Sequence, residues 1–369
     1  MTINAKTLFD PSLEKDNCGF GLIAQRNGKR SRKLVKKSIL GLTSMTHRGA
    51  IGADGKTGDG CGLLFDLNHS FFKLKVGGEL DVELPDFFAV AQLFHKNDID
   101  FYYSSIRKFL NSQDLDIAVI RSVPVNNEVL GKIARQNLPN ISQVFITSKN
   151  TNLNKERFEA CLLQARKFIE EKFDNDEEFY VCSMSTQTIV YKGLMLPSAI
   201  DEFYLDLKDK KFEAKICLFH QRFSTNTLPR WHLAQPFRLL AHNGEINAIR
   251  GNRNWAKARK SKFSTALIPE ITTFKNLVNE KGSDSSALDN MIEILVKGGI
   301  NTFRALRMVL PPAWQNIHMM DPEIKSFHEY NSMHMEAWDG PAGIVMSDGR
   351  WAICLLDRNG LRPARYQID

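Results

Sequence analysis

One cysteine of the chain stands in a setting that favours nucleophilic chemistry. Cys18 follows a short polar leader, residues 1–17, and is followed by Gly19 and Gly21. Because glycine has no Cβ atom, these two positions would let a substrate approach the backbone closely. A cysteine thiolate attacks carbonyl carbons once a neighbouring base has taken its proton. Cys18 is therefore our candidate nucleophile.

The other five cysteines are spread along the chain, and we predict that they are buried structural thiols. They lie at positions 61, 161, 182, 217 and 354, and the sequence has no Cys-x-x-Cys pair. This spacing favours neither a structural zinc site nor a disulfide scaffold. We expect reduced thiols and no bound metal.

Two charged residues are candidates for holding an amino acid by its charged ends. Arg222 follows an apolar segment, and its planar guanidinium is suited to a bidentate contact with a carboxylate. Solvation at the end of a strand is the simpler interpretation of such an arginine. Asp284 either caps the helix that we expect to begin there, binds a substrate ammonium, or does both.

A third candidate group is the pair Asn243 and Gly244, at the end of another apolar segment. Asn-Gly is a common turn sequence, and that interpretation is favoured when the pair is considered alone. The functional alternative is an oxyanion hole, formed by the side-chain amide of Asn243 and the backbone N–H of Gly244.

The elements that must position these residues are short strands and amphipathic helices. Strands are indicated by runs rich in residues that suit a half-buried pleated surface, and helices by apolar residues at helical spacing. A glycine-rich loop occupies 47–62, and we expect one mixed α/β domain. We predict strands at 18–24, 87–94, 116–123, 143–147, 179–185, 188–191, 213–220, 237–241, 343–346, 351–356 and 364–368, and helices around 29–42, at 155–172, from 284 onward and at 302–309.

The composition excludes several classes of protein. With 43% hydrophobic and 25% charged residues in a chain of 369, it is that of an ordinary globular protein. No apolar run approaches the roughly 20 residues that cross a bilayer, so we expect no membrane partner. The leader is acidic and has no apolar stretch, unlike a secretory signal, and we expect a cytoplasmic location.

The formal net charge of +7 raises the alternative of a basic nucleic-acid-binding protein. Basic residues cluster at 29–37 and 250–262, and the first cluster is interleaved with Leu34, Val35, Ile39 and Leu42 at helical spacing. Such lysines are typical of the solvated face of an amphipathic helix. Without clustered aromatic side chains to stack on bases, we expect no nucleic-acid partner.

Taken together, these motifs resemble one family along most of the chain. The sequence is similar to the N-terminal glutaminase domain of the glutamate synthase large subunit, a class II glutamine amidotransferase. The similar segments are 18–24, 47–50, 52–60, 220–227, 231, 236–237, 241–247, 282–289, 311–315, 332–336, 338–349 and 357–363.

The resemblance implies an α+β fold of the N-terminal nucleophile hydrolase type, a four-layer αββα sandwich of two antiparallel sheets between helical layers. It also implies L-glutamine as substrate and Cys18 as nucleophile. By the same resemblance, Arg222 binds the α-carboxylate, Asp284 binds the α-ammonium group, and Asn243 with Gly244 forms the oxyanion hole.

The resemblance further implies that residues 1–17 are a propeptide and that 18–369 are the glutaminase domain, which we expect to lack its last strands. Family members continue with a synthase domain that binds FMN and a 3Fe-4S cluster, a β-helix domain and a separate small subunit. We therefore expect no cofactor in this chain. For the parent enzyme we expect the NADPH type, with NADH and ferredoxin as the alternative electron donors. The alternatives are the glutaminase domain of another class II amidotransferase and an inactive basic fragment that acts as a binding module.

Overall fold

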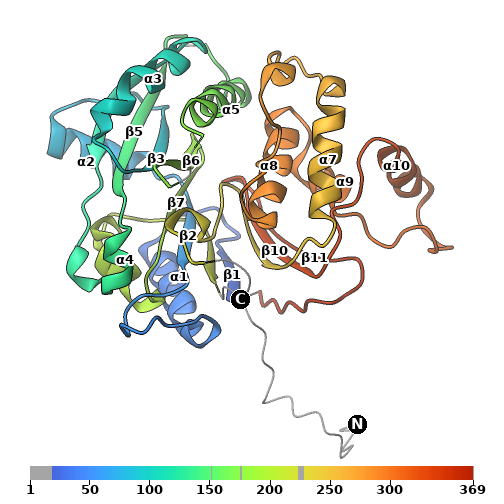
Figure 1. Ribbon diagram of the computed structural model, residues 1–369, viewed down its shortest axis with the longest axis horizontal. Coiled ribbons are helices and arrows are strands. Elements are labelled where there is room, and N and C mark those ends of the chain that lie inside the picture. Colours follow the sequence, from blue (N-terminus) through green and yellow to red (C-terminus); the bar gives the residue numbers. More distant parts are fainter. Residues whose placement is uncertain (1–18, 151, 175–176, 223–227, 369) are drawn as a thin grey trace, which may run out of the picture.

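The computed structural model describes residues 19–150, 152–174, 177–222 and 228–368. In this part of the chain the strands form three antiparallel sheets with helices packed around them (Figure 1). The first sheet has the order β1 (Gly19–Ala24), β8 (Ile216–Gln221), β2 (Cys61–Asp66) and β7 (Thr188–Gly193). The second has the order β11 (Ala352–Leu356), β10 (Ala342–Ser347) and β9 (Leu240–Gly244).

The first two sheets pack against each other through a small apolar layer. Leu64 and Leu218 of the first sheet meet Ala241 and Val345 of the second. Because successive strand residues point to opposite faces, the residues beside them point outward to the helices. On the first sheet these residues pack in one core with α1 (Arg32–Ser44), and on the second they pack with α8 (Asp284–Lys297) and α9 (Thr302–Val309). This arrangement is the expected four-layer αββα sandwich.

A third sheet extends the sandwich. Its order is β4 (Leu115–Ser122), β5 (Asn140–Ser148), β3 (Ala89–His95) and β6 (Phe179–Ser185), and a tight turn joins β6 directly to β7. One face packs with α3 (Ile99–Asn111) and α5 (Lys155–Lys172) through residues such as Leu93, Ile106 and Leu162. The resemblance to the family predicted two sheets, so this sheet is an addition to the predicted fold.

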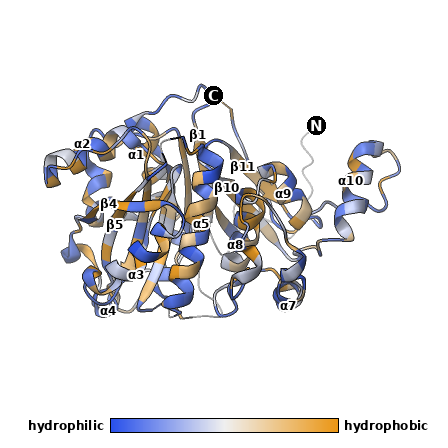
Figure 2. Cartoon of the chain, turned by 90° about the horizontal axis from the view of Figure 1, so that it is seen from above, coloured by the Kyte–Doolittle hydropathy of each residue, from blue (hydrophilic) through white to orange (hydrophobic). Residues whose placement is uncertain are grey.

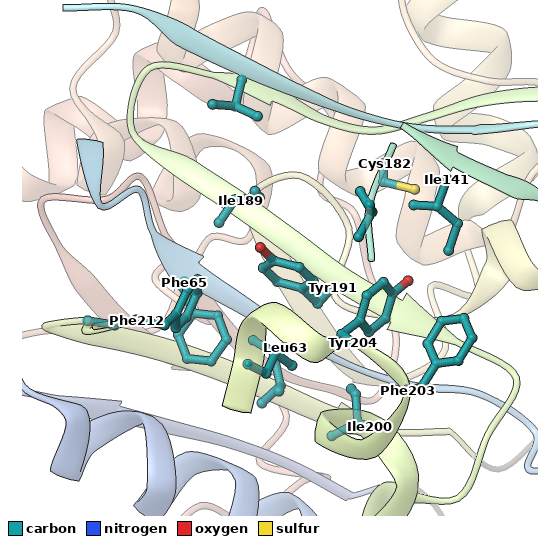
Figure 3. Packing of buried hydrophobic residues seen from close by; sticks show 14 of the residues in the cluster. Leu63, Phe65, Ile141, Cys182, Ile189, Tyr191, Ile200, Phe203, Tyr204 and Phe212 are labelled. Carbon is teal, nitrogen blue, oxygen red and sulfur yellow. The ribbon is translucent and has the colours of Figure 1, made fainter. Parts of the chain in front are cut away.

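The largest core joins the third sheet to the first. Figure 3 shows Ile141 and Cys182 of the third sheet close to Tyr191 of β7 and Tyr204. The hydroxyl group of Tyr204 donates a hydrogen bond to the backbone oxygen of Lys192, so the buried phenol is satisfied.

Five further α-helices are present in the described residues. They are α2 (His69–Leu80), α4 (Lys132–Gln136), α6 (Ile200–Phe203), α7 (Ile249–Arg259) and α10 (Pro322–Ser332). Of these, α10 stands apart from the helices that cover the sheets (Figure 2). Within the described residues no helix is both long enough and apolar enough to span a membrane.

Most predicted elements are present. The boundaries of α5, β6 and α9 match the predicted ones. The loop at 47–62 contains a short 3-10 turn, an isolated bridge between Ile51 and Gly58, and the start of β2. The basic cluster at 29–37 lies largely on the exposed face of α1, whose Leu34 and Val35 are buried, as predicted. The predicted strand at 18–24 is confirmed from Gly19 onward, and Cys18 itself lies outside the described residues.

Other predictions are wrong. No strand forms at 364–368, because Asp357 accepts hydrogen bonds from the N–H groups of Asn359, Leu361 and Arg362 and turns the chain away after β11. Cys354 is exposed rather than buried, since it lies on the edge strand β11. The strand predicted from residue 237 begins only at Leu240, for a reason given below.

Candidate active site

Arg222 lies immediately after β8, where the first sheet ends. Its neighbour Gln221 pairs with Gly19 of β1 on one side and with Cys61 of β2 on the other. The backbone N–H of Arg222 donates to the oxygen of Gly60 at 2.9 Å, and the Arg222 side chain is almost fully buried. Arg222 therefore does not have the solvated position that the simpler interpretation expects. Residues 223–227, which follow it, lie outside the described residues.

Asn243 and Gly244 are the last two residues of β9, where they pair with Gly343 and Ala342 of β10. They do not form a hairpin turn, so the turn interpretation of Asn-Gly is wrong. Gly244 has a φ of 149°, and a Cβ atom added there would lie 1.8 Å from the oxygen of Pro341. Glycine is required at this position because L side chains rarely adopt such a backbone conformation and because there is no space for one.

Asp284 is the first residue of α8. The N-cap of this helix is Ser283, whose hydroxyl oxygen accepts a hydrogen bond from the N–H of Ser286, so Asp284 is not the cap. The Asp284 carboxylate instead accepts a hydrogen bond from the N–H of Ile246, with 2.7 Å between the Oδ2 and N atoms. This contact joins the first turn of α8 to the segment that follows Gly244.

Two buried histidines connect these segments. His220 of β8 donates from Nε2 to the backbone oxygen of His242 in β9, at 3.2 Å. The Nδ1 atom of His242 lies 2.8 Å from the hydroxyl oxygen of Ser285, which in turn donates to Asp284. Burial lowers the pKa of His220 to about 3 and also lowers the pKa of His242, although Asp284 opposes the second shift. Both rings are therefore neutral near pH 7.

The beginning of β1 lies against the end of β9. Phe20 pairs with His220, and a Cβ atom added at Gly343 would lie 2.9 Å from the Phe20 ring. Since Gly343 is the partner of Asn243, the first residues of β1 and the end of β9 are close to each other. The structure thus places Asn243, Gly244 and Asp284 in one region, next to the strand ends that carry Gly19 and Arg222.

Asp289 of α8 is a residue that the sequence analysis missed. Its carboxylate accepts hydrogen bonds from three successive backbone N–H groups, those of Arg238, Leu239 and Leu240. These contacts explain why β9 begins at Leu240, because the preceding N–H groups point to Asp289 rather than to a strand. The available indication in the sequence was an aspartate in the middle of an apolar helical pattern, because a carboxylate buried at such a position needs hydrogen-bond partners.

A cleft of about 400 Å³ opens beside this region. Gly282 and Ser286, which are close to Asp284 in sequence, belong to its wall, as do Lys167 of α5 and His232. Among the described residues, its lining does not include Arg222, Asn243, Gly244 or Asp284. The cleft is therefore next to the candidate site rather than the site itself.

The other cysteines are unlike a nucleophile. Cys61, Cys161, Cys182 and Cys217 are buried, and burial raises the pKa of the Cys182 thiol to about 12. A thiol with so high a pKa carries almost no thiolate at pH 7. Within the described residues, no group of three or more histidine, cysteine, aspartate or glutamate side chains is arranged to hold a metal ion.

The basic helix α7 offers little for stacking against nucleic-acid bases. Trp255 is the one aromatic residue in its sequence, and the guanidinium group of Arg259 lies 4.4 Å from the centre of that ring. The ring is therefore already partly covered from within its own helix.

Comparison with known proteins gives a consistent result. The model of the family "Glutamine amidotransferases class-II" matches residues 18–369. The glutamate synthase [NADPH] large chain of Bacillus subtilis is 39% identical over 370 residues, which cover 99% of this chain and 24% of that protein. The glutamate synthase [NADH] of Saccharomyces cerevisiae is 38% identical over 376 residues, which cover 98% of this chain and 17% of the yeast protein.

The ferredoxin-dependent glutamate synthase 1 of Arabidopsis thaliana is 39% identical over 367 residues, covering 96% of this chain and 22% of the plant protein. The chain thus spans at most about a quarter of the length of these relatives.

Proposed function

Because this chain belongs to the class II glutamine amidotransferases and is a domain of the glutamate synthase type, we propose that it hydrolyses L-glutamine to glutamate and ammonia with Cys18 as the nucleophile. The observation that supports this most directly is the contact of Asp284 with Ile246. It brings a carboxylate suited to an α-ammonium group within a few residues of the Asn243–Gly244 pair.

Cys18 carries its own base in this mechanism. Once residues 1–17 are removed, its α-amine has an expected pKa of about 7.7–8.0, which suits a general base near neutral pH. The start of the family match at residue 18 supports a processed N-terminus at this position. Gly19, the residue that follows Cys18 in the sequence, is paired with Gln221, the residue before Arg222.

The reaction proceeds through a thioester. The amine takes the thiol proton, and the thiolate attacks the amide carbon of glutamine to give a tetrahedral oxyanion. The side chain of Asn243 and the backbone N–H of Gly244 stabilise that oxyanion. Collapse breaks the C–N bond, and the protonated amine returns its proton to the departing ammonia. Water then hydrolyses the thioester to glutamate and regenerates the thiol.

Substrate binding is assigned to two charged residues. Arg222, almost fully buried after β8, is proposed to hold the α-carboxylate with its guanidinium fork. Asp284, in the first turn of α8, is proposed to hold the α-ammonium group with its carboxylate. Since both charged ends of an amino acid would be satisfied, the site would favour free glutamine over a glutamine residue within a peptide.

In the whole protein, we infer that the ammonia passes to a synthase centre of the kind that the relatives' names imply. That centre would combine ammonia with 2-oxoglutarate, use FMN and a 3Fe-4S cluster, and work with a small subunit and NADPH. We also infer a cytoplasmic location. The compared relatives are named glutamate synthases, which favours this assignment over another class II amidotransferase.

The test is the stoichiometry of the reaction. The purified chain is incubated with glutamine, with and without 2-oxoglutarate and a reductant, and glutamate and ammonia are measured. We expect a glutamate-to-ammonia ratio near one in both cases, because the FMN-dependent centre would lie outside this chain. Two glutamates formed for each glutamine, without free ammonia, would show that the synthase chemistry resides here.

A further inference from the structure

We propose that Asp289 is a positioning residue that fixes the end of β9, with Asn243 and Gly244, relative to the start of α8, with Asp284. This inference rests on the function proposed above, because it concerns the alignment of the oxyanion-hole residues with the residue that would bind the α-ammonium group.

The contacts of Asp289 are with the backbone just before and at the start of β9. Its Oδ1 atom lies 2.9 Å from the nitrogen of Leu239 and 3.2 Å from that of Leu240, and its Oδ2 atom lies 3.3 Å from the nitrogen of Arg238. Asp289 is fully buried. A buried carboxylate that accepts three successive N–H groups holds the backbone in place, because each donor would lose a partner if the strand moved.

Helix α8 contacts this strand and its continuation at three levels. Asp289 binds the backbone at the beginning of β9, Ser285 binds the ring of His242 within it, and Asp284 binds the N–H of Ile246 beyond it. Asp284 and Asp289 are five residues apart on one helix, about 7.5 Å along its axis. A shift of β9 at Asp289 would therefore change the position of Asn243, three residues after Leu240, relative to Asp284.

The surroundings of Asp289 make its charge state sensitive to pH. Burial and the neighbouring carboxylate of Glu293 raise its pKa to about 6, whereas Arg238 and the backbone N–H donors oppose the rise. Arg166 forms an ion pair with Glu293, and Arg238 forms one with Glu170. Lys167 is a further charged group of this cluster. His242 is the titratable residue that β9 presents to α8, and its pKa is lowered.

Protonation of Asp289 should loosen the backbone contacts. The carboxylate is mainly ionised at pH 7.5 and accepts all three N–H groups. In the neutral acid one oxygen becomes an O–H group, which is a weaker acceptor and brings its own proton toward the N–H donors. The affinity of the site for glutamine should therefore weaken as the pH falls through about 6. A residue with only a structural role would not produce this change in substrate affinity.

The test compares the full processed chain with its Asp289→Asn variant. The amide keeps one accepting oxygen but directs an NH₂ group toward at least one backbone donor, so volume is preserved while at least one of the three contacts is lost. At pH 7.5 and well below the melting temperature, we expect the KM for glutamine to rise about ten-fold, the size of effect expected when one hydrogen bond to a charged group is lost. The increase in KM that wild type shows near pH 6 should disappear in the variant.

Asp206→Asn is the matched control. Asp206 is also a fully buried carboxylate, but its partner is the Arg121 side chain near the third sheet. This variant should lose stability and keep both the KM for glutamine and its pH dependence.

The outcomes separate the two proposals. An Asp289→Asn variant with the KM and pH profile of wild type, even if it melts earlier, would show that Asp289 is only structural. If that variant does not fold, the pH dependence of the wild-type KM for glutamine is the test. A wild-type KM that is constant from pH 7.5 to 5.5 would overturn the inference. A wild-type chain that is folded, processed and unable to hydrolyse glutamine would instead refute the proposed function.

Discussion

The carboxylate of Asp284 and the backbone N–H of Ile246 form a hydrogen bond in which the Oδ2 and N atoms are 2.7 Å apart. This bond joins the first turn of helix α8 to the segment just after the edge strand β9. Asp284 is only partly buried, which leaves it accessible to a ligand as well. The same carboxylate is thus suited both to hold the backbone near Gly244 and to bind a cation.

Asp284→Asn should weaken glutamine binding while leaving the fold intact. The amide oxygen still accepts the Ile246 N–H, but the negative charge for the α-ammonium group is lost. A hydrogen bond to a charged group contributes about 1.5–3 kcal/mol, so KM should rise roughly ten-fold to 100-fold. Ser283→Ala is the control: it removes the N-cap, should cost about 1 kcal/mol of stability, and should change KM much less. An unchanged KM in Asp284→Asn would remove Asp284 from the substrate site.

Gly244→Ala should damage catalysis. A methyl group at this position would collide with the Pro341 oxygen, and the φ of 149° is unfavourable for alanine. The backbone N–H proposed for the oxyanion hole would be displaced, and kcat should fall on the order of 100-fold. The control is Gly251→Ala on α7. Apart from the backbone of its own helix, no atom lies within 4 Å of a Cβ atom added there, and alanine should stabilise the helix by about 0.5–1 kcal/mol. Equal kcat values in the two variants would argue against this role of Gly244.

Asn243→Ala should lower kcat by about 10² to 10³, the usual effect of removing one oxyanion-hole donor. Asn252→Ala is a suitable control, because Asn252 is also a buried asparagine and binds a backbone oxygen, that of Ala337, away from the site. If Asn243→Ala lowered the melting temperature but kept kcat, the oxyanion role would have to be assigned elsewhere.

The buried histidines should make the protein sensitive to acid. His220 and His232 both have a pKa lowered to about 3 by burial, whereas histidines in the unfolded chain titrate near 6.5. Between these values the unfolded state binds more protons, so the free energy of unfolding falls as the pH falls. Each group contributes up to about 1.4 kcal/mol per pH unit. The raised pKa of Asp289 acts in the opposite direction between about 4 and 6, but it is one group against two.

Denaturant titrations of wild type and His220→Gln between pH 7 and 4.5 measure this effect. We expect the free energy of unfolding to fall less steeply with decreasing pH in the variant than in wild type, by an amount that corresponds to up to one bound proton. Identical slopes would mean that His220 does not titrate as its burial indicates.

The sequence alone predicted the elements whose residues have a regular pattern. The apolar stripe of α5 and the dense strand β6 were located to the residue, because local propensity and burial agree there. In contrast, α3 was missed although Tyr102, Ile106 and Leu110, which are four positions apart, form a buried stripe on one face of the helix. Helix α2 was also missed, because Gly77 and Gly78 weaken its helical pattern. The start of β9 depends on Asp289, a residue about fifty positions away, and no local pattern contains that information.

The candidate site shows the same limit. Local sequence suggested chemical roles for Cys18, Arg222, Asn243 and Asp284. For the last three, a solvated arginine, a turn and a helix cap were at least as compatible with the sequence until the family resemblance was considered. What brings the segments together is sheet pairing between distant residues, such as Gly19 with Gln221 and Asn243 with Gly343. His220 and His242 were inside the recognised motifs, yet their role as a buried link between strands depends on the packing of two sheets.

The central claim is that Cys18, as a free N-terminal residue, performs the hydrolysis. Wild type and Cys18→Ala are purified, the N-terminus of each is determined by mass spectrometry, and ammonia release from glutamine is measured. We expect wild type that has lost residues 1–17 to release ammonia, and Cys18→Ala to release none above the buffer. Sustained ammonia release by Cys18→Ala, or by a wild-type chain that retains Asn17, would contradict the account.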